Sequence, residues 1–247
     1  MRLAIFSDSH GNAFGLEAML ADLERRGGAD TLVCLGDVAQ GGAQPRECIE
    51  LVRALGCPVV LGNADAFLLD VASAEGSREP VTARQLEVRE WTLAQLAPDD
   101  LDFIRGFQPT VEVRFESGGR ALCFHGSPDS FEDVILPSTP EEEVRALLAD
   151  RGAALLTGGH THLQQFRRFA GAVFLNPGSV GLAYDHEQFD DAISFDPWAE
   201  YAVVTVDGGG SAWEFRRVPF DGEAVATIGL ERARPYAQED AARWGKP

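Results

Sequence analysis

The feature that most constrains the fold is an alternation of short apolar runs with longer amphipathic segments near the start of the chain. Apolar runs occupy residues 3–6, 31–35 and 58–61, and helix-like periodicity covers residues 14–26 and 45–55. Strands separated by helices of this length are typical of βαβ units, in which the strands run parallel and the helices cross between them. The sequence therefore predicts an α/β fold that begins with a βαβαβ unit.

The remainder of the chain is expected to complete a mixed sheet. Helical periodicity returns over residues 81–105, and hairpin-like strand pairs surround the turns at 117–119, 170–171 and 208–210. A helical tail follows the last hairpin. The sequence contains no internal repeat and no segment with the composition of a linker, so we expect one domain over residues 1–247.

One further helix and strand are predicted between the first two hairpins. Thr139 is expected to be the N-cap of this helix, with Pro140 in the first turn and Glu142 three residues after the cap, as in a capping box. The helix runs toward Leu148. The apolar run at 154–157 is then expected to be a buried strand.

Composition narrows the class of partner. The formal net charge is −18, which argues against a broad basic surface for a nucleic-acid polymer and favours a small substrate. A site for an anion in so acidic a chain needs a local source of positive charge, and metal ions would supply one. The chain has no secretory-type start, no apolar run of about 18 residues and no CxxC pair among its four cysteines, so we expect a reduced cytoplasmic protein without a membrane span.

Polar side chains of metal-ligand type follow the apolar runs, at the points where the predicted strands end. These residues are Asp8, His10, Asp37, Asn63, His125, His160, His162 and Asn176. The chain has only five histidines, and four of them lie in these positions. Because ligands of open α/β sheets bind beyond the carboxyl ends of the strands, we expect these side chains to converge.

The types of donor indicate which ions would bind. Asp, His and Asn ligands without thiolates suit divalent Mn, Fe, Co, Ni or Zn and argue against a structural cysteine-rich zinc site. One ion cannot accommodate seven of these eight groups. Two ions that share a carboxylate can, at the separation of roughly 3.5 to 4 Å found in two-metal hydrolases.

The motifs that carry these residues resemble the calcineurin-like metallophosphoesterase superfamily, and within it the small bacterial and archaeal phosphodiesterase branch. In family order they are DSHGN (8–12), GDV (36–38), GNAD (62–65), HGS (125–127), GHTH (159–162) and NPGSVG (176–181). The resemblance implies a four-layer α/β/β/α sandwich with two mixed β-sheets and a binuclear metal centre.

The resemblance also implies roles for individual residues. Asp8, His10 and His162 would hold one metal ion, and Asn63, His125 and His160 would hold the other. Asp37 would bridge both ions and hold the attacking hydroxide. Asn176 would brace the surrounding loops.

The sequence departs from the family pattern at one position. Many members read GNHD or GNHE, and their histidine assists the leaving oxygen, whereas this chain has Ala64. Members with other residues at this position are known. Without a general acid, which is typically worth about 10²- to 10⁴-fold, we expect a preference for leaving groups that need little protonation. Asp65 either loses a histidine partner or caps the helix that follows it.

These observations predict a metal-dependent phosphoesterase that hydrolyses a phosphodiester, phosphomonoester or phosphoanhydride of nucleotide-like size by in-line attack of a metal-bridging hydroxide. The alternative is a metal-binding scaffold of the same fold with little or no turnover, for which Ala64 is the argument. A nuclease of the same superfamily is disfavoured by the negative charge.

Three features near the predicted centre have two interpretations each. His186 either replaces the missing general acid or is a solvated loop histidine. Asn12 either contacts a phosphate at the first turn of a helix or only caps that helix. The aromatic and acidic segment 182–200 either forms a rim that selects the substrate or packs on the edge of the sheet.

Overall fold

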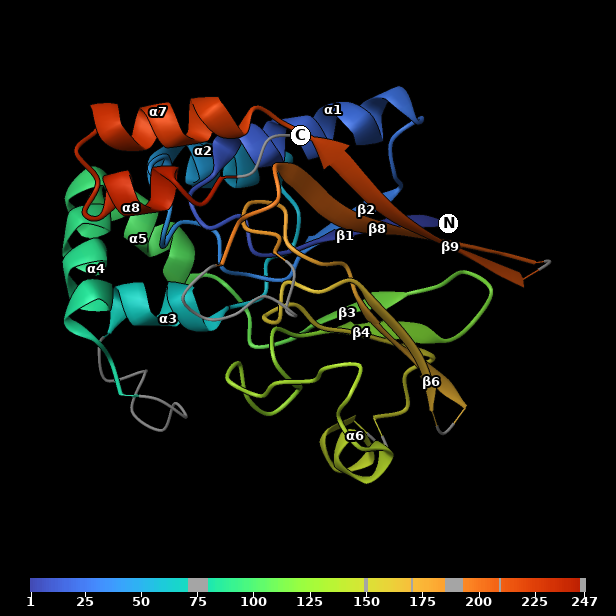
Figure 1. Cartoon of the computed structure of the whole chain (residues 1–247). Coiled ribbons are helices and arrows are strands. Elements are labelled where there is room, and N and C mark those ends of the chain that lie inside the picture. Colours follow the sequence, from blue (N-terminus) through green and yellow to red (C-terminus); the bar gives the residue numbers. More distant parts are fainter. Residues whose placement is uncertain (71–79, 149–150, 170, 185–192, 209, 245–247) are drawn as a thin grey trace.

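The chain folds into a sandwich of two β-sheets with helices on both outer faces (Figure 1). The computed structural model describes residues 1–70, 80–148, 151–169, 171–184, 193–208 and 210–244. No helix in these ranges has the length and apolar character that crossing a membrane requires. The four-layer α/β/β/α arrangement with two mixed sheets agrees with the expected fold class.

The first sheet has the order β2-β1-β8-β9. Its strands are β1 (Arg2–Phe6), β2 (Thr31–Cys34), β8 (Trp198–Asp207) and β9 (Gly210–Pro219). Strands β1 and β2 are parallel and are joined by helix α1 (Ala13–Arg25), as predicted. Strand β8 pairs antiparallel with both β1 and β9, so the last hairpin is added to the first βαβ unit.

The second sheet has the order β3-β4-β5-β7-β6. Its strands are β3 (Val111–Arg114), β4 (Arg120–Cys123), β5 (Leu155–Thr157), β6 (Gln165–Phe169) and β7 (Ala172–Asn176). Strands β4, β5 and β7 are parallel, and the two outer strands pair antiparallel with them. The parallel strands of each sheet therefore end toward the same part of the molecule.

Helices cover the two sheets unequally. Those that pack with the first sheet or extend beyond its end are α2 (Pro45–Leu55), α3 (Asn63–Leu69), α4 (Ala83–Gln95), α5 (Pro98–Arg105), α7 (Gly222–Glu231) and α8 (Ala237–Ala241), together with α1. Helix α6 (Glu141–Leu148) packs against the outer face of the second sheet. Figure 1 shows α6 at the opposite side of the sandwich from α1, α2 and α7.

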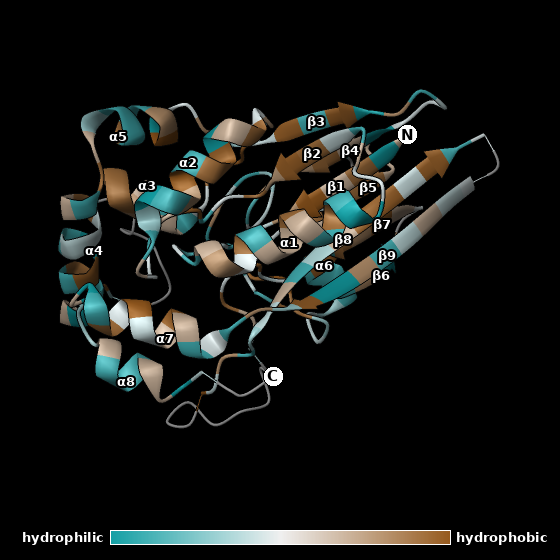
Figure 2. Cartoon of the chain, turned by 90° about the horizontal axis from the view of Figure 1, so that it is seen from above, coloured by the Kyte–Doolittle hydropathy of each residue, from teal (hydrophilic) through white to brown (hydrophobic). Residues whose placement is uncertain are grey.

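The alternation of side chains along β1 explains why the layers form. Leu3 and Ile5 belong to the core between the two sheets, whereas Ala4 and Phe6 belong to the core beneath the helices. Successive residues of a strand point to opposite faces, so a strand buried on both faces is apolar throughout. In Figure 2 the strands β1 and β2 are accordingly mostly brown.

Three local predictions were wrong in detail. Residues 58–61 form no strand, because Val59 and Val60 make only single bridges. The helix expected over 81–105 is divided into α4 and α5, since Pro98 starts a new helix whose first turn is capped by the Asp100 carboxylate at the Ala97 N–H.

The capping box predicted at Thr139 does not form. Helix α6 begins at Glu141, and the Thr139 hydroxyl accepts a hydrogen bond from the Leu136 N–H, which precedes the helix. The Pro140 carbonyl accepts the first helical hydrogen bond, from Val144, so Pro140 occupies the cap position. The hydroxyl is therefore used to close the preceding turn rather than to cap the helix.

Candidate metal centre

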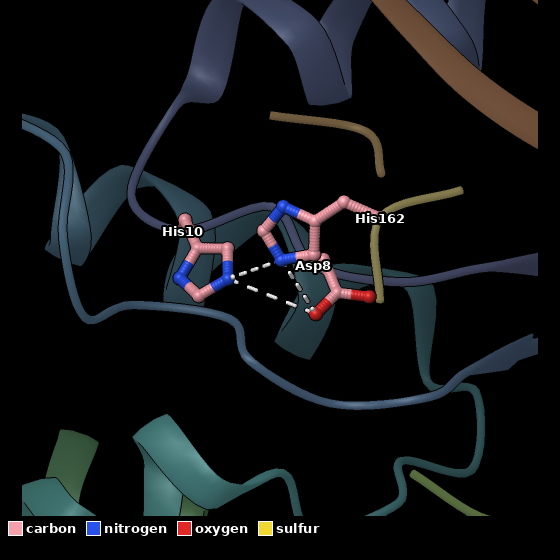
Figure 3. A group of neighbouring side chains, drawn as sticks. All are labelled: Asp8, His10 and His162. Carbon is pink, nitrogen blue, oxygen red and sulfur yellow. Dashed lines mark hydrogen bonds and ion pairs between the residues drawn. The ribbon is translucent and has the colours of Figure 1, made fainter. Parts of the chain in front are cut away.

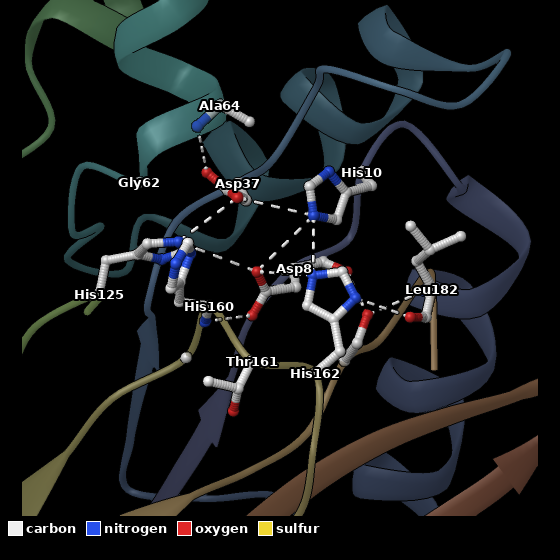
Figure 4. A network of polar contacts seen from close by, with 12 residues as sticks. Asp8, His10, Asp37, Gly62, Ala64, His125, His160, Thr161, His162 and Leu182 are labelled. Atoms are coloured by element: carbon white, nitrogen blue, oxygen red, sulfur yellow. Dashed lines mark hydrogen bonds and ion pairs between the residues drawn. The ribbon is translucent and has the colours of Figure 1, made fainter. Parts of the chain in front are cut away.

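The side chains that follow the strands meet at the carboxyl ends of both sheets (Figure 4). From the first sheet come the residues after β1 and β2, and from the second come the residues after β4 and β5; Asn63 is the first residue of α3. Together they are Asp8, His10, Asp37, Asn63, His125, His160 and His162. The structure brings all seven of these side chains together.

The backbone at this centre is unusual. Seven non-glycine residues in the described ranges have φ in the left-handed region, and five of them belong to the centre: Asp8 (59°), His10 (44°), Asp37 (55°), His160 (67°) and His162 (55°). A side chain disfavours this conformation, and such strain is maintained only where the surrounding structure demands it. The sharp turns aim the side chains inward at the ends of the strands.

Asp8, His10 and His162 form one cluster of donor atoms (Figure 3). The Nε2 atoms of the two imidazoles lie 3.1 Å apart. The Asp8 Oδ1 atom lies 3.3 Å from His162 Nε2 and 3.7 Å from His10 Nε2. Asp8 is fully buried, and its Oδ1 atom has no hydrogen-bond partner within the described chain.

Asp37 and His125 form a second cluster with Asp8. The Asp37 Oδ2 atom lies 3.3 Å from His125 Nε2 and 3.6 Å from His10 Nε2, which places this oxygen between the two clusters. The Asn63 Oδ1 atom lies 3.0 Å from both His125 Nε2 and His160 Nδ1. The donor atoms thus form one continuous group.

Backbone carbonyls fix the orientation of three imidazoles. The Nδ1 atoms of His10, His125 and His162 lie 2.7–2.8 Å from the carbonyl oxygens of Gln40, Leu35 and Leu182. A carbonyl can only accept, so each Nδ1 carries a hydrogen and each neutral imidazole presents the Nε2 lone pair to the centre. This arrangement is typical of metal-binding histidines, whose second nitrogen donates to a carbonyl or carboxylate.

The electrostatics of the centre favour positive charge. Burial disfavours the charged form of His10, but contact with Asp8 and the charges of Asp37 and Asp8 outweigh it and raise the pKa of His10 to about 9. Burial also opposes the charged form of His125, but the charge of Asp37 and contact with it outweigh burial and raise the pKa of His125 to about 10. Burial and the charge of His125 instead lower the pKa of His160 to about 4. The carboxylates therefore retain protons on two imidazoles, and a cation can replace these protons.

The donor set fits divalent metal ions. Two buried carboxylates, four imidazoles and one amide oxygen converge, and an unpartnered carboxylate oxygen faces two imidazole nitrogens. Buried lone pairs that face one another are costly unless a proton or a cation lies between them. Nitrogen and oxygen donors without sulfur suit borderline or hard divalent ions.

Two glycines permit this close approach. A Cβ atom at Gly62 would clash with the Asp37 carboxylate, and one at Gly159 would clash with the Ser7 hydroxyl and approach Asp8 Oδ2. The absence of these side chains lets the backbone N–H of Ala64 donate to Asp37 Oδ1 (2.8 Å). It also lets the N–H of His160 donate to Asp8 Oδ2 (3.1 Å).

Residues outside the ligand set hold the loops in place. The Asn176 amide donates to the Gly159 carbonyl (2.6 Å), as expected of a bracing residue. Asp65 caps α3 through the Gly62 N–H and also accepts hydrogen bonds from the N–H groups of Asp37 and Val38. This second role was missed, because no sequence pattern connects position 65 with a loop 28 residues earlier.

Ser179 was also missed. Its hydroxyl donates to the Asp8 carbonyl (2.7 Å) and accepts from the Leu182 N–H (2.8 Å). The serine therefore connects the turn after β1 with the residue whose carbonyl orients His162. Its place within the NPGSVG motif was the one signal in the sequence.

The three features with two interpretations, Asn12, His186 and the segment 182–200, have different outcomes. Asn12 is the N-cap of α1: its Oδ1 atom accepts from the Gly15 N–H, and its amide donates to the Gly181 carbonyl. The capping interpretation is therefore correct, and Asn12 remains in the wall of a neighbouring cavity. His186 lies outside the described residues, as does most of the segment between Tyr184 and Ser194. The Tyr184 ring stands edge-on to His162, with ring centroids 5.8 Å apart.

A cavity of about 290 Å³ opens over the centre. Side chains of the candidate centre form part of its lining, which also includes Ala64, Phe67, Gln85 and Glu132. Burial, followed by the negative charge of Asp37, raises the pKa of Glu132. The methyl group of Ala64 leaves the wall beside Asn63 without a titratable side chain.

Comparisons with known proteins agree with this fold. An uncharacterized protein of Methanocaldococcus jannaschii is 28% identical over 198 residues, which span 74% of this chain and 77% of the relative. A metallophosphoesterase from Sphaerobacter thermophilus has a similar structure (TM-score 0.75, 24% identity, 98% of this chain and 99% of that chain). So does a hypothetical protein from Pyrococcus horikoshii (TM-score 0.79, 18% identity, 100% and 99%).

The family comparison covers most of the chain. The sequence model of the calcineurin-like phosphoesterase superfamily domain matches residues 1–197, which include every residue of the centre described above. The matched region contains the strands whose carboxyl ends carry these side chains. The chain therefore belongs to the calcineurin-like phosphoesterase superfamily.

Proposed function

We propose that this chain is a phosphoesterase that uses two divalent metal ions to hydrolyse a small, nucleotide-like phosphodiester, phosphomonoester or phosphoanhydride. The observation that carries the proposal is the continuous group of seven donors, in which Asp37 Oδ2 lies between His10 and His125. Membership of the phosphoesterase superfamily supports the class of reaction. The open cavity above the donors supports a substrate of small size.

The proposed ligand sets follow the two clusters. Asp8, His10 and His162 would hold one ion, Asn63, His125 and His160 the other, and Asp37 both. Asp8 Oδ1 also lies 4.0 Å from His125 Nε2, so this carboxylate lies near both sets. We propose manganese, iron, zinc, nickel or cobalt as the ions, from the nitrogen and oxygen donors. When bound, such ions lower the pKa of water and neutralise charge on a phosphoryl group.

The residues of the chain hold the groups of the centre in fixed positions. Backbone carbonyls and the Ala64 N–H hold the imidazoles and Asp37 in fixed orientations, so little reorganisation is needed when substrate arrives. Fixed donors in a buried setting stabilise developing charge more strongly than mobile ones. Asp8 and Asp37 remain ionised, because contacts with the imidazoles outweigh burial and lower the pKa of both carboxyls.

The position of Ala64 determines the expected substrate preference. Ala64 lies in the wall of the cavity, where a histidine would contact the leaving group. With methyl in its place, position 64 supplies no proton to the leaving oxygen. We propose that the substrates are esters or anhydrides whose leaving groups depart without protonation. We also propose that the substrate is small and that the chain acts in the cytoplasm. Neither a nucleic-acid polymer nor a membrane is a partner in this proposal.

Turnover of bis(4-nitrophenyl) phosphate tests the activity. Protein loaded with Mn²⁺ should release 4-nitrophenolate, and Asp37→Asn should lose at least about 100-fold in kcat/KM, since even partners of metal ligands cost 10- to 100-fold. The matched control is Asp102→Asn, which changes an exposed carboxylate on α5 that pairs with Arg105. An aryl ester should react faster than a simple alkyl ester, and equal rates would contradict the role given to Ala64.

The alternative function is a metal-binding scaffold, which Ala64 favours. Metal analysis by mass spectrometry separates the two functions. Protein that binds metal through Asp37 but releases no 4-nitrophenolate from any ester would support the scaffold. Protein that neither binds metal nor turns over would contradict both.

A further inference from the structure

A second cavity of about 240 Å³ lies beside the metal centre. Its walls come from the residues around His10 and Asn12, from the loop 41–43, from Gly181 and Leu182, and from the C-terminal helices α7 and α8. Figures 1 and 2 both show α7 and α8 next to each other at the end of the molecule that also holds α4. Half of the residues that line this cavity lie beyond residue 197, where the superfamily match ends.

The two cavities are neighbours. His10 and Leu182 line both of them, so a molecule that occupies the metal-centre cavity can extend past His10 into the second one. Small-molecule sites usually measure about 300 to 1,000 Å³. The second cavity lies below this range and the metal-centre cavity lies at its lower limit, whereas the two together lie within it. The second cavity is therefore of the right size for one part of a substrate.

Three aromatic residues lead from the centre to the second cavity. The Tyr184 ring lies beside His162, the backbone of Tyr184 forms an isolated β-bridge with that of Phe195, and the backbone of Phe195 forms another with that of Trp244. The rings of Phe195 and Trp244 lie 5.3 Å apart, and Phe220 packs edge-on against Trp244 at 5.8 Å. Phe195 and Trp244 line the cavity together with Leu182 and Val225. Such a wall suits a planar, apolar group.

The polar groups of the cavity are mainly basic. Arg84, Arg234 and Arg243 line it, together with one acidic residue, Asp240. Asp240 pairs closely with Arg84 (2.6 Å) and Arg234 (2.5 Å), but it lies 3.9 Å from Arg243. Arg243 is thus the least neutralised of the three. The chain has a net charge of −18, whereas this wall is locally basic and can accept an anionic molecule.

We propose that this cavity binds the nucleoside part of the substrate, with its base against the wall formed by Phe195 and Trp244. The inference rests on the proposed function, because it assigns the phosphoester to the adjacent metal centre. The three arginines of the second cavity make it acceptable to an anionic nucleotide, and the aromatic wall can accept different bases. The substrate is accordingly a nucleotide ester or anhydride.

Two neighbouring alanines provide a matched test: Ala241 is the last residue of α8, and Ala242 follows it. Ala241 lines the cavity, whereas the adjacent Ala242 is exposed and does not. Ala241→Phe should fill the space that the base occupies, and Ala242→Phe should not. The substrates are thymidine 5′-(4-nitrophenyl) phosphate and methyl 4-nitrophenyl phosphate, which share the same leaving group and differ in the nucleoside.

The wild type should have a higher kcat/KM for the thymidine ester than for the methyl ester, because only the thymidine ester carries a nucleoside. Ala241→Phe should lower kcat/KM for the thymidine ester at least about tenfold, the order of magnitude of one base–aromatic contact. It should change kcat/KM for the methyl ester less than about twofold, as should Ala242→Phe for both substrates. Equal losses on both substrates, or no loss on the thymidine ester, would overturn the inference.

A binding measurement separates this inference from the proposed function. If the wild type hydrolyses neither ester, the proposed function fails, and calorimetric titration of the protein with thymidine 5′-monophosphate decides the inference alone. Binding that Ala241→Phe weakens about tenfold and Ala242→Phe retains would support the nucleoside cavity. Absence of binding, or equal binding by both variants, would refute it. Circular dichroism checks that Ala241→Phe is folded, and Ala226→Phe, which fills the cavity from α7, serves as a second variant.

Discussion

At the scale of single residues, the centre depends on groups that hold the ligands as much as on the ligands themselves. Asp65 is fully buried, and its two carboxylate oxygens accept hydrogen bonds from the N–H groups of Asp37, Val38 and Gly62. Burial and the charge of Asp37 raise the pKa of Asp65 to about 7. One carboxylate thus maintains the strained turn at which Asp37 has a φ of 55°.

Replacing this carboxylate with an amide tests its importance. Asp65→Asn presents an NH₂ group where an oxygen accepted a backbone hydrogen bond, so one buried donor is left facing another. We expect a loss of about 1 to 3 kcal/mol in the free energy of unfolding, measured with urea, and weaker Mn²⁺ binding. Asp99→Asn, an exposed change at the start of α5, should alter neither quantity. Unchanged Mn²⁺ affinity in Asp65→Asn would contradict the positioning role.

The ligand-type residues were predictable because their signal is local. Each follows an apolar run, and four of five histidines share this placement, so convergence followed from the rule that parallel strands end together. Thr139 was mispredicted from equally local evidence, because its hydroxyl had two possible partners and closes the turn at Leu136. The contacts of Ser179 and Asp65 join distant segments, and no local pattern encodes them.

At the scale of elements, the sequence predicted the hairpins and the strands that are buried on both faces. The prediction was least reliable for short apolar segments such as residues 58–61. The run at 58–61 is apolar enough for a strand, but only Val59 and Val60 form bridges before α3 begins at Asn63. The C-terminal helices were expected as a tail. Their packing with α4, through the ion pairs of Arg84 with Glu239 and Asp240, depends on tertiary contacts and was not predictable.

Strand β8 contains a buried carboxylate whose titration affects stability. Glu200 packs beneath Gly178 of the loop after β7, and Arg217 donates to it from β9 (2.8 Å). Burial raises the pKa of Glu200 from 4.5 to about 7, despite the opposing charge of Arg217. Since the folded chain holds this proton more tightly than the unfolded chain, the stability from Glu200 is complete below pH 4.5 and is lost as the pH rises through about 7.

Glu200→Gln should remove this dependence. The amide keeps the shape of the protonated carboxyl and retains an acceptor for Arg217, so the variant should lose less stability than the wild type between pH 5 and pH 8. Urea unfolding at both pH values measures the difference. Glu223→Gln, an exposed change on α7, should follow the wild type. Parallel stability profiles for Glu200→Gln and the wild type would show that Glu200 is not responsible.

At the scale of the whole molecule, a net charge of −18 surrounds a site proposed for anions. The excess of negative charge repels phosphorylated molecules at long range, whereas the proposed metal ions and the three arginines of the second cavity would attract them at short range. Long-range repulsion is screened by salt, because the Debye length falls from about 30 Å at 0.01 M to about 8 Å at 0.15 M. The short-range attraction is buried and is screened much less.

This difference in range predicts an unusual salt dependence. Raising the ionic strength from 0.01 M to 0.15 M should increase kcat/KM of the Mn²⁺-loaded protein, and more for the doubly charged 4-nitrophenyl phosphate than for the singly charged bis(4-nitrophenyl) phosphate. Proteins that hold phosphates through a basic surface behave in the opposite way, because salt weakens their binding steeply. Steady-state rates in KCl measure the trend. A decrease for both substrates would mean that a basic surface, rather than the metal centre and its adjoining cavity, dominates capture of the substrate.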